Sequence, residues 1–143
     1  MIDVMDTKNF FKEVHLAPDE KFACKGIVKE LINLARIIYN GDVNAFEEQA
    51  AQSESKLLKI MAKLIAYGCA PEVVDEVMTR IINSEGYKGR ELFEALLIVE
   101  GMTLIQNSVN PDLIGLKLSS LLGLDYFYHE FDNCLLKPGI INH

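Results

Sequence analysis

Residues 97–122 read LIVEGMTLIQNSVNPDLIGLKLSSLL, a pattern typical of two helices joined by a short turn. Apolar side chains recur at helical spacing before and after a break that follows Gln106. The break ends in Asn-Pro-Asp at residues 110–112, which supplies an N-cap side chain, a proline at the first helical position and an acid in the first turn. We therefore predict a long helix over residues 90–106 and a second helix that begins at Pro111.

The same pattern occurs forty residues earlier in the chain. Residues 57–82 read LLKIMAKLIAYGCAPEVVDEVMTRII, and a shift of forty aligns Pro71 with Pro111 without a gap. The shift also pairs apolar positions in both helices, so we expect an internal repeat, 57–82 and 97–122, of two helical hairpins that stack and share a core. The alternative is that any two amphipathic helices align in part, because their apolar residues recur at the same spacing.

The flanking segments are also helical in pattern. Apolar positions from 27 to 38 form a stripe, and Pro18 suits the first turn of a helix that continues into it. Asp42 is a plausible N-cap for a short helix, and Asp125 for a last helix that runs through Leu136. Because no segment alternates with period two, we predict one all-α domain over residues 1–143: two stacked helical hairpins with flanking N- and C-terminal helices.

The composition argues against several classes of protein. The 143 residues carry a net charge of −7, with 14 basic residues scattered among 21 acidic ones, which disfavours nucleic acid and anionic membranes as partners. Cys24, Cys69 and Cys134 are odd in number and far apart, as in proteins of a reducing compartment. The N-terminus lacks a signal-peptide pattern, and no apolar run approaches the ~18 residues of a membrane span. We expect a soluble protein in the cytoplasm, with no direct membrane insertion.

The second copy of the repeat contains four short motifs in a fixed order: Glu100-Gly101, Ile105-Gln106, Asn110-Pro111 and Lys117-Leu118. This series resembles the segment that follows the last membrane span of MotA, the flagellar stator subunit in the MotA/TolQ/ExbB family of proton channels. Earlier motifs resemble the cytoplasmic region between the second and third spans of MotA: Leu34-Ala35, Ala45-Phe46-Glu47, Ala66-Tyr67-Gly68 and Pro71-Glu72 with Val74. The resemblance covers about residues 28–122 and implies a shared helical scaffold.

The chain departs from MotA in ways that bear on function. Residues 84–89 directly join the two pieces that membrane spans separate in MotA, so the resemblance does not imply a proton channel. MotA has a basic and an acidic residue that engage the rotor; the acid corresponds to Glu47, but Tyr39 stands at the basic position. The resemblance thus implies a protein interface around Tyr39, Glu47 and Glu48, and the negative charge of the two glutamates favours a partner with a basic surface.

The motif of Glu100, Gly101, Asn110 and Pro111 has a structural interpretation. Glycine inside a helix costs roughly 1 kcal/mol relative to alanine, so Gly101 predicts a close approach of another helix. Glu100 lies on an apolar helix face, as either a functional acid or a glutamate that is hydrogen-bonded to the turn near Asn110. The resemblance to MotA favours the structural interpretation, a bond from Glu100 to the turn near Asn110.

One polar helix face near the C-terminus allows a different interpretation. Asp125, His129 and Asp132 fall at i, i+4 and i+7, with Cys134 nearby, which matches either a solvated face or a set of metal ligands. No nucleophile–base grouping and no phosphate-binding glycine loop is present in the sequence.

We therefore expect an interaction module that binds a protein, or a second copy of itself, in a motility setting. It is not expected to be an enzyme or to need a cofactor. The alternative is a small metal-dependent enzyme, or a metal-binding regulator, that uses the His129 region. A fusion of cytoplasmic pieces is another origin, which the unmatched terminal segments disfavour.

Overall fold

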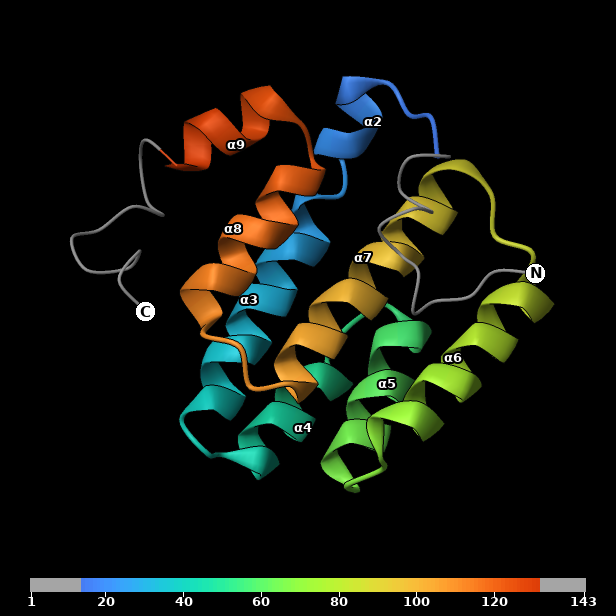
Figure 1. Ribbon diagram of the computed structural model, residues 1–143, viewed down its shortest axis with the longest axis vertical. Helices are drawn as coiled ribbons and strands as arrows, with labels where there is room; N and C mark the ends of the chain where they lie inside the picture. The colour runs from blue at the N-terminus through green and yellow to red at the C-terminus, as the bar shows by residue number, and fades with distance from the viewer. Residues whose placement is uncertain (1–13, 132–143) are drawn as a thin grey trace.

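The structure, a computed structural model, describes residues 14–131 of the chain. In this range, helices are joined by turns and short loops and there is no strand, so the predicted all-α class is confirmed (Figure 1). The helices are α2 (Pro18–Phe22), α3 (Lys25–Tyr39), α4 (Val43–Ala51), α5 (Lys56–Ala66), α6 (Pro71–Glu85), α7 (Gly89–Gln106), α8 (Pro111–Leu121) and α9 (Leu124–Glu130). Of these described helices, none is long and hydrophobic enough to span a membrane.

Helix α7 is the centre of the fold. It packs against α2, α3, α5, α6 and α8, and Figure 1 shows it between the α3–α8 pair and the α5–α6 pair. Residues 95–99, the most apolar run of the chain, are buried on every side of the helix. A helix that is hydrophobic all round is stable only when other elements surround it, and α7 meets this condition.

Helix α3 packs against both helices of the second predicted hairpin, α7 and α8. Its buried face consists of the apolar stripe predicted from the sequence: Ile27, Val28, Leu31, Leu34 and Ala35. The expected continuous helix from Pro18 through this stripe is wrong, because α2 ends at Phe22 and a turn separates it from α3. The turn directs the ring of Phe22 against Tyr126 of α9, with centroids 5.7 Å apart, a long-range contact that local periodicity does not encode.

Capping side chains fix several helix starts. The backbone N–H of Ala45 donates to Asp42 Oδ1 at 2.9 Å, which confirms Asp42 as an N-cap. The backbone N–H of Asp112 donates to Asn110 Oδ1 at 2.8 Å, with Pro111 at the first helical position, as predicted. In contrast, Gly123 is the N-cap of α9, so Asp125 lies in the first turn of that helix instead of capping it.

Candidate functional site

The C-terminal end of α5 is closed by a pair of backbone hydrogen bonds. The N–H of Gly68 donates to the carbonyl of Ile65 at 3.0 Å, and the N–H of Cys69 donates to the carbonyl of Leu64 at 3.1 Å. This is the Schellman arrangement, in which the residue after the C-cap takes a left-handed conformation. Gly68 has φ 80°, and the next helix begins at Pro71.

The end of α7 has the same arrangement forty residues later. The N–H of Ser108 donates to the carbonyl of Ile105 at 3.0 Å, and the N–H of Val109 donates to the carbonyl of Leu104 at 3.1 Å. Ser108 has φ 57°, and within residues 14–131 it is the only non-glycine residue with a positive φ. The two turns therefore share a backbone geometry, although only the first has the glycine that this geometry favours.

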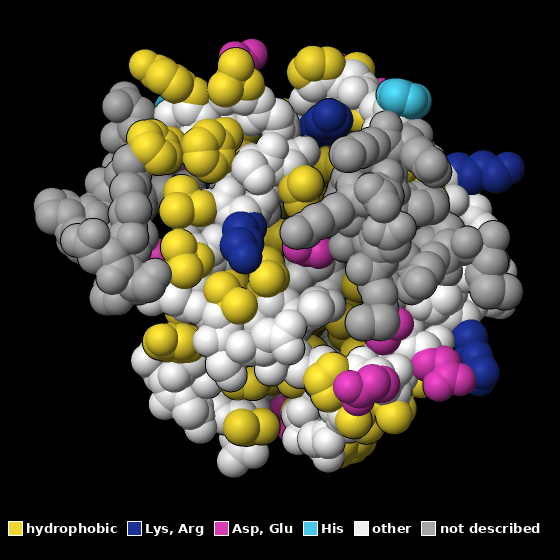
Figure 2. All heavy atoms as spheres, in the orientation of Figure 1, with side chains coloured by type: hydrophobic (Ala, Val, Ile, Leu, Met, Phe, Trp, Pro, Cys, Tyr) yellow, Lys and Arg dark blue, Asp and Glu magenta, His cyan; other side chains and the backbone are white. Residues whose placement is uncertain are grey.

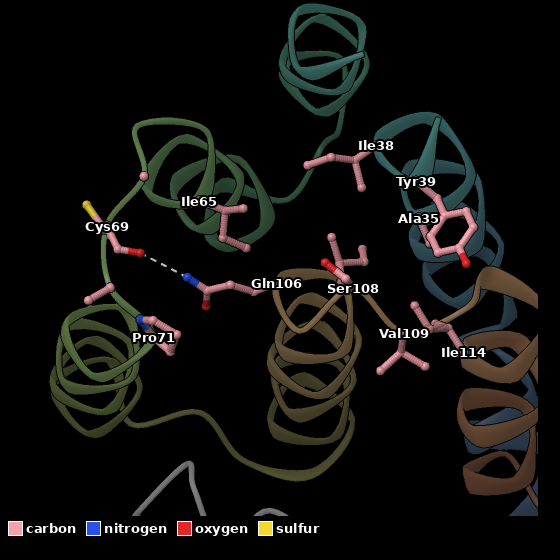
Figure 3. A pocket seen from close by; sticks show the side chains of 13 residues that line it. Ala35, Ile38, Tyr39, Ile65, Cys69, Pro71, Gln106, Ser108, Val109 and Ile114 are labelled. Atoms are coloured by element: carbon pink, nitrogen blue, oxygen red, sulfur yellow. Dashed lines mark hydrogen bonds between the residues drawn. The ribbon is translucent and has the colours of Figure 1, made fainter. Parts of the chain in front are cut away.

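A side chain joins the two turns directly. Nε2 of Gln106, the last residue of α7, donates a hydrogen bond of 2.9 Å to the backbone carbonyl of Cys69 (Figure 3). Because this bond connects residues 37 positions apart, it holds the end of α7 against the turn between α5 and α6.

A hollow of about 520 Å³ lies where the two turns face α3. We call it the turn pocket. In Figure 3, Cys69 and Pro71 lie on one side and Ala35 and Tyr39 on the other, with Gln106 and Ser108 between them. Its lining residues come from α3, α5, α6, α7, α8 and both turns: Ala35, Ile38, Tyr39, Ile65, Gly68, Cys69, Ala70, Pro71, Ile105, Gln106, Ser108, Val109 and Ile114.

The lining of the turn pocket is uncharged. None of the thirteen residues that form it is Lys, Arg, Asp, Glu or His, so the lining offers no counter-ion for a charged ligand and no strong general base. Polar atoms are supplied by the Tyr39 and Ser108 hydroxyls and the Gln106 amide. The volume lies in the range of sites that enclose small organic groups, so the pocket suits an uncharged group that is mostly apolar.

No protein-family model, no curated protein and no solved structure matches the chain.

The structure does not bring the predicted interface residues Tyr39, Glu47 and Glu48 together in one hollow. Tyr39, which is 54% exposed, borders the turn pocket. Glu47 lines a second hollow, of about 430 Å³, between α4 and α5. Glu48 is exposed on α4 and lines neither hollow. Sequence reasoning missed Gln106 and Ser108 as lining residues, although the forty-residue alignment of Gly68 with Ser108 was a readable signal.

Gly101 packs closely against α3. Gly101 is buried, and a Cβ atom added to it would lie 2.9 Å from Cδ1 of Leu31 on α3. The close approach expected at this glycine is thus made by a side chain and not by the backbone of the neighbouring helix. Glu100, its neighbour on α7, is partly buried.

The suggested metal ligands are not brought together in the part of the chain that the structure describes. Asp125 and His129 are exposed on α9, whereas Asp132 and Cys134 lie outside the described residues. Within residues 14–131, no group of three or more His, Cys, Asp or Glu side chains is arranged to hold a metal ion.

Cys24 has the properties of a structural thiol. It is buried, and its Sγ donates to the backbone carbonyl of Glu20 at 3.7 Å. Burial, and secondarily the negative charge of Glu94, raise the pKa of the thiol from 9.0 to about 11. Burial also raises the pKa of Glu94, against the opposing effect of Arg90. A thiol with a raised pKa is a poor nucleophile near neutral pH, so Cys24 does not suggest covalent catalysis.

The face of the molecule drawn in Figure 2 has an apolar and an acidic region. Figure 2 shows apolar side chains most densely over α8 and α9, where Leu124 and Tyr128 are 79% and 68% exposed. Acidic side chains gather over α6, where Glu76 pairs with Arg80 at 2.6 Å. That ion pair is exposed and spans one helical turn, so it contributes little to stability.

Proposed function

We propose that this chain is a cytoplasmic protein-interaction module, and that the turn pocket holds an uncharged side chain of its partner. The observation that carries the proposal is the uncharged lining of the pocket beside the exposed ring of Tyr39. Tyrosine is enriched among the residues that dominate binding energy at interfaces, because it contributes a large apolar area and a polar tip. An aliphatic or aromatic side chain entering the pocket would contact Ile38, Val109 and Ile114.

We further infer that segments 57–82 and 97–122 are two copies of one helical hairpin. The matched hydrogen bonds at the ends of α5 and α7, and the prolines at the starts of α6 and α8, support this inference. In this account the turn pocket forms where the equivalent turns of two adjacent repeats meet. Helical repeat proteins often bind their partners on the face where corresponding turns line up.

The relation to the cytoplasmic region of MotA, and with it a motility setting, is part of the same proposal. It rests on the motifs at Glu100-Gly101 and Asn110-Pro111, and on Glu47 at the position of the rotor-contacting acid. Tyr39, at the position of the basic residue, would here contribute an apolar contact in place of a charge.

Affinity capture with matched variants tests the proposed function. Wild-type protein, Tyr39→Ala and Tyr67→Ala are immobilised and exposed to lysate of the native cells. Tyr67 is the matched control because it is 76% exposed and does not line the turn pocket. The proposal expects one protein to be captured by the wild type and by Tyr67→Ala and to be lost with Tyr39→Ala. Equal capture by all three proteins would contradict a role for the turn pocket.

A further inference from the structure

The hollow between α4 and α5 differs in charge from the rest of the molecule. Its lining contains three lysines, Lys56, Lys59 and Lys63, and one carboxylate, Glu47. The whole chain carries a net charge of −7, so this hollow concentrates positive charge on an acidic protein. We call it the lysine groove.

The lysines lie on one face of α5. Their spacing of three and four residues places them along a single edge of the helix, which spans Lys56–Ala66. Within residues 14–131, none of the three takes part in an ion pair, in contrast to Arg36 and Arg80. Their charges are therefore available to a partner.

The floor of the groove is apolar. Ile60 is 44% exposed, although it lies among helix residues that pack into the core. Ala50 and Ala62 are buried at the base, and Ala51 lies beside them. Small side chains at the base of a groove leave room for a helix to approach closely. The combination of an apolar floor and one basic edge matches an amphipathic helix with acidic flanks.

We propose that the lysine groove binds an acidic amphipathic helix of a partner protein. Apolar side chains of that helix would cover Ile60 and the alanines, and carboxylates spaced three to four residues apart would meet Lys56, Lys59 and Lys63. Three lysines without an aromatic stacking surface do not favour a nucleic acid, and the isoleucine floor favours a helix over a lipid headgroup. This surface shares no lining residue with the turn pocket, so the peptide test does not depend on capture through Tyr39; it shares only Glu47 with the contact that the MotA resemblance implies.

The test uses a designed helical peptide as the probe. One peptide has leucines at i, i+4, i+7 and i+11 with glutamates on both flanks, and a second has the same composition in scrambled order. Binding of each labelled peptide to the full chain is followed by fluorescence anisotropy at low and moderate salt. Anionic phospholipid vesicles are tested in parallel by co-sedimentation.

Two charge-matched variants separate the groove from general electrostatics. The groove variant carries Lys56→Glu, Lys59→Glu and Lys63→Glu. The control variant carries three lysine-to-glutamate changes at exposed lysines outside the groove: Lys29→Glu, Lys88→Glu and Lys117→Glu. Both variants change the net charge equally, and circular dichroism checks that each is folded. If the groove variant unfolds, Lys59→Gln with Lys63→Gln replaces it, against Lys88→Gln with Lys117→Gln.

The proposal predicts saturable binding of the amphipathic peptide and clearly weaker binding of the scrambled one. Three exposed charge pairs together correspond to about a tenfold change in affinity, so the groove variant should bind about tenfold more weakly than the control variant. The proposal is overturned if the amphipathic peptide does not bind, if the scrambled peptide binds as well, or if both variants lose affinity equally. Groove-dependent binding of the vesicles in place of the peptide would also overturn it.

Discussion

Gly68 and Ser108 occupy the same backbone position at two helix ends, forty residues apart in the chain. Both have a positive φ, 80° and 57°, and both stand between the same pair of hydrogen bonds. The backbone geometry is therefore repeated although the residue is not. A side chain in the left-handed region costs free energy that glycine avoids, so the second turn retains a strain that the first does not.

Exchanging these two residues tests the equivalence of the turns. Gly68→Ser should lower the free energy of unfolding by about 1 kcal/mol, because it introduces the left-handed cost of an L-residue. Ser108→Gly should raise it by up to about 1 kcal/mol, since relief of that cost exceeds the added entropy of the unfolded chain. Urea denaturation measures both. A destabilised Ser108→Gly protein would show that the serine side chain has a structural role of its own.

The hydrogen bond from Gln106 to the carbonyl of Cys69 should stabilise the fold. Gln106→Met keeps most of the side-chain volume but removes the donor, so it should lower the free energy of unfolding by roughly 0.5–1.5 kcal/mol. The matched control is Gln52→Met at the exposed end of α4, which should change stability by less than about 0.5 kcal/mol. Thermal unfolding compares the two variants, and equal melting of Gln106→Met and wild type would argue against a bond that ties the turns.

The contact between Gly101 and Leu31 limits the size of residue 101. Gly101→Leu should destabilise the protein by about 1–3 kcal/mol, because the added atoms would overlap the buried side chain of Leu31. Gly26→Leu is the control, since Gly26 is also helical but has no neighbour within 4 Å of an added Cβ. It should leave stability unchanged or slightly raised. Equal effects of the two substitutions in chemical denaturation would refute the steric explanation.

The raised pKa of Cys24 predicts a pH-dependent contribution to stability. The unfolded thiol ionises near pH 9.0 and the folded thiol near pH 11. The contribution of the buried neutral thiol is thus complete below about pH 9 and is lost as the pH rises towards 11. We expect the stability difference between wild type and Cys24→Ala to be smaller at pH 10 than at pH 8. Because the other titrating groups are present in both proteins, their effect on stability cancels in this comparison. A stability difference that does not change with pH would contradict the prediction.

The helical elements were predictable where the chain carries local signals. Asn110 and Pro111 mark the start of α8 because a capping oxygen and a preset φ act within one turn. Asp42 marks the start of α4 because its side chain also supplies a capping oxygen. The break between α2 and α3 was not predictable, because it is tied to the contact of Phe22 with Tyr126, more than a hundred residues away.

The candidate sites were predictable only in part. The sequence could show Lys56, Lys59 and Lys63 on one helix face, but not that α4 packs beside them and brings Glu47 into the same hollow. In the same way, the proximity of Tyr39 to both turns depends on the packing of α3 against α7 and α8. Such sites arise from tertiary contacts, which a single sequence does not specify.

The central claim is that the turn pocket binds a protein, and site-specific photo-cross-linking in the native cells tests it most directly. A photoreactive phenylalanine analogue replaces Tyr39 at the edge of the pocket in one strain and Tyr67, outside the lining, in another. Irradiation should link the Tyr39-substituted protein to one discrete partner and leave the Tyr67-substituted protein without that product. Absence of the product at position 39, or its equal yield at both positions, would contradict the claim.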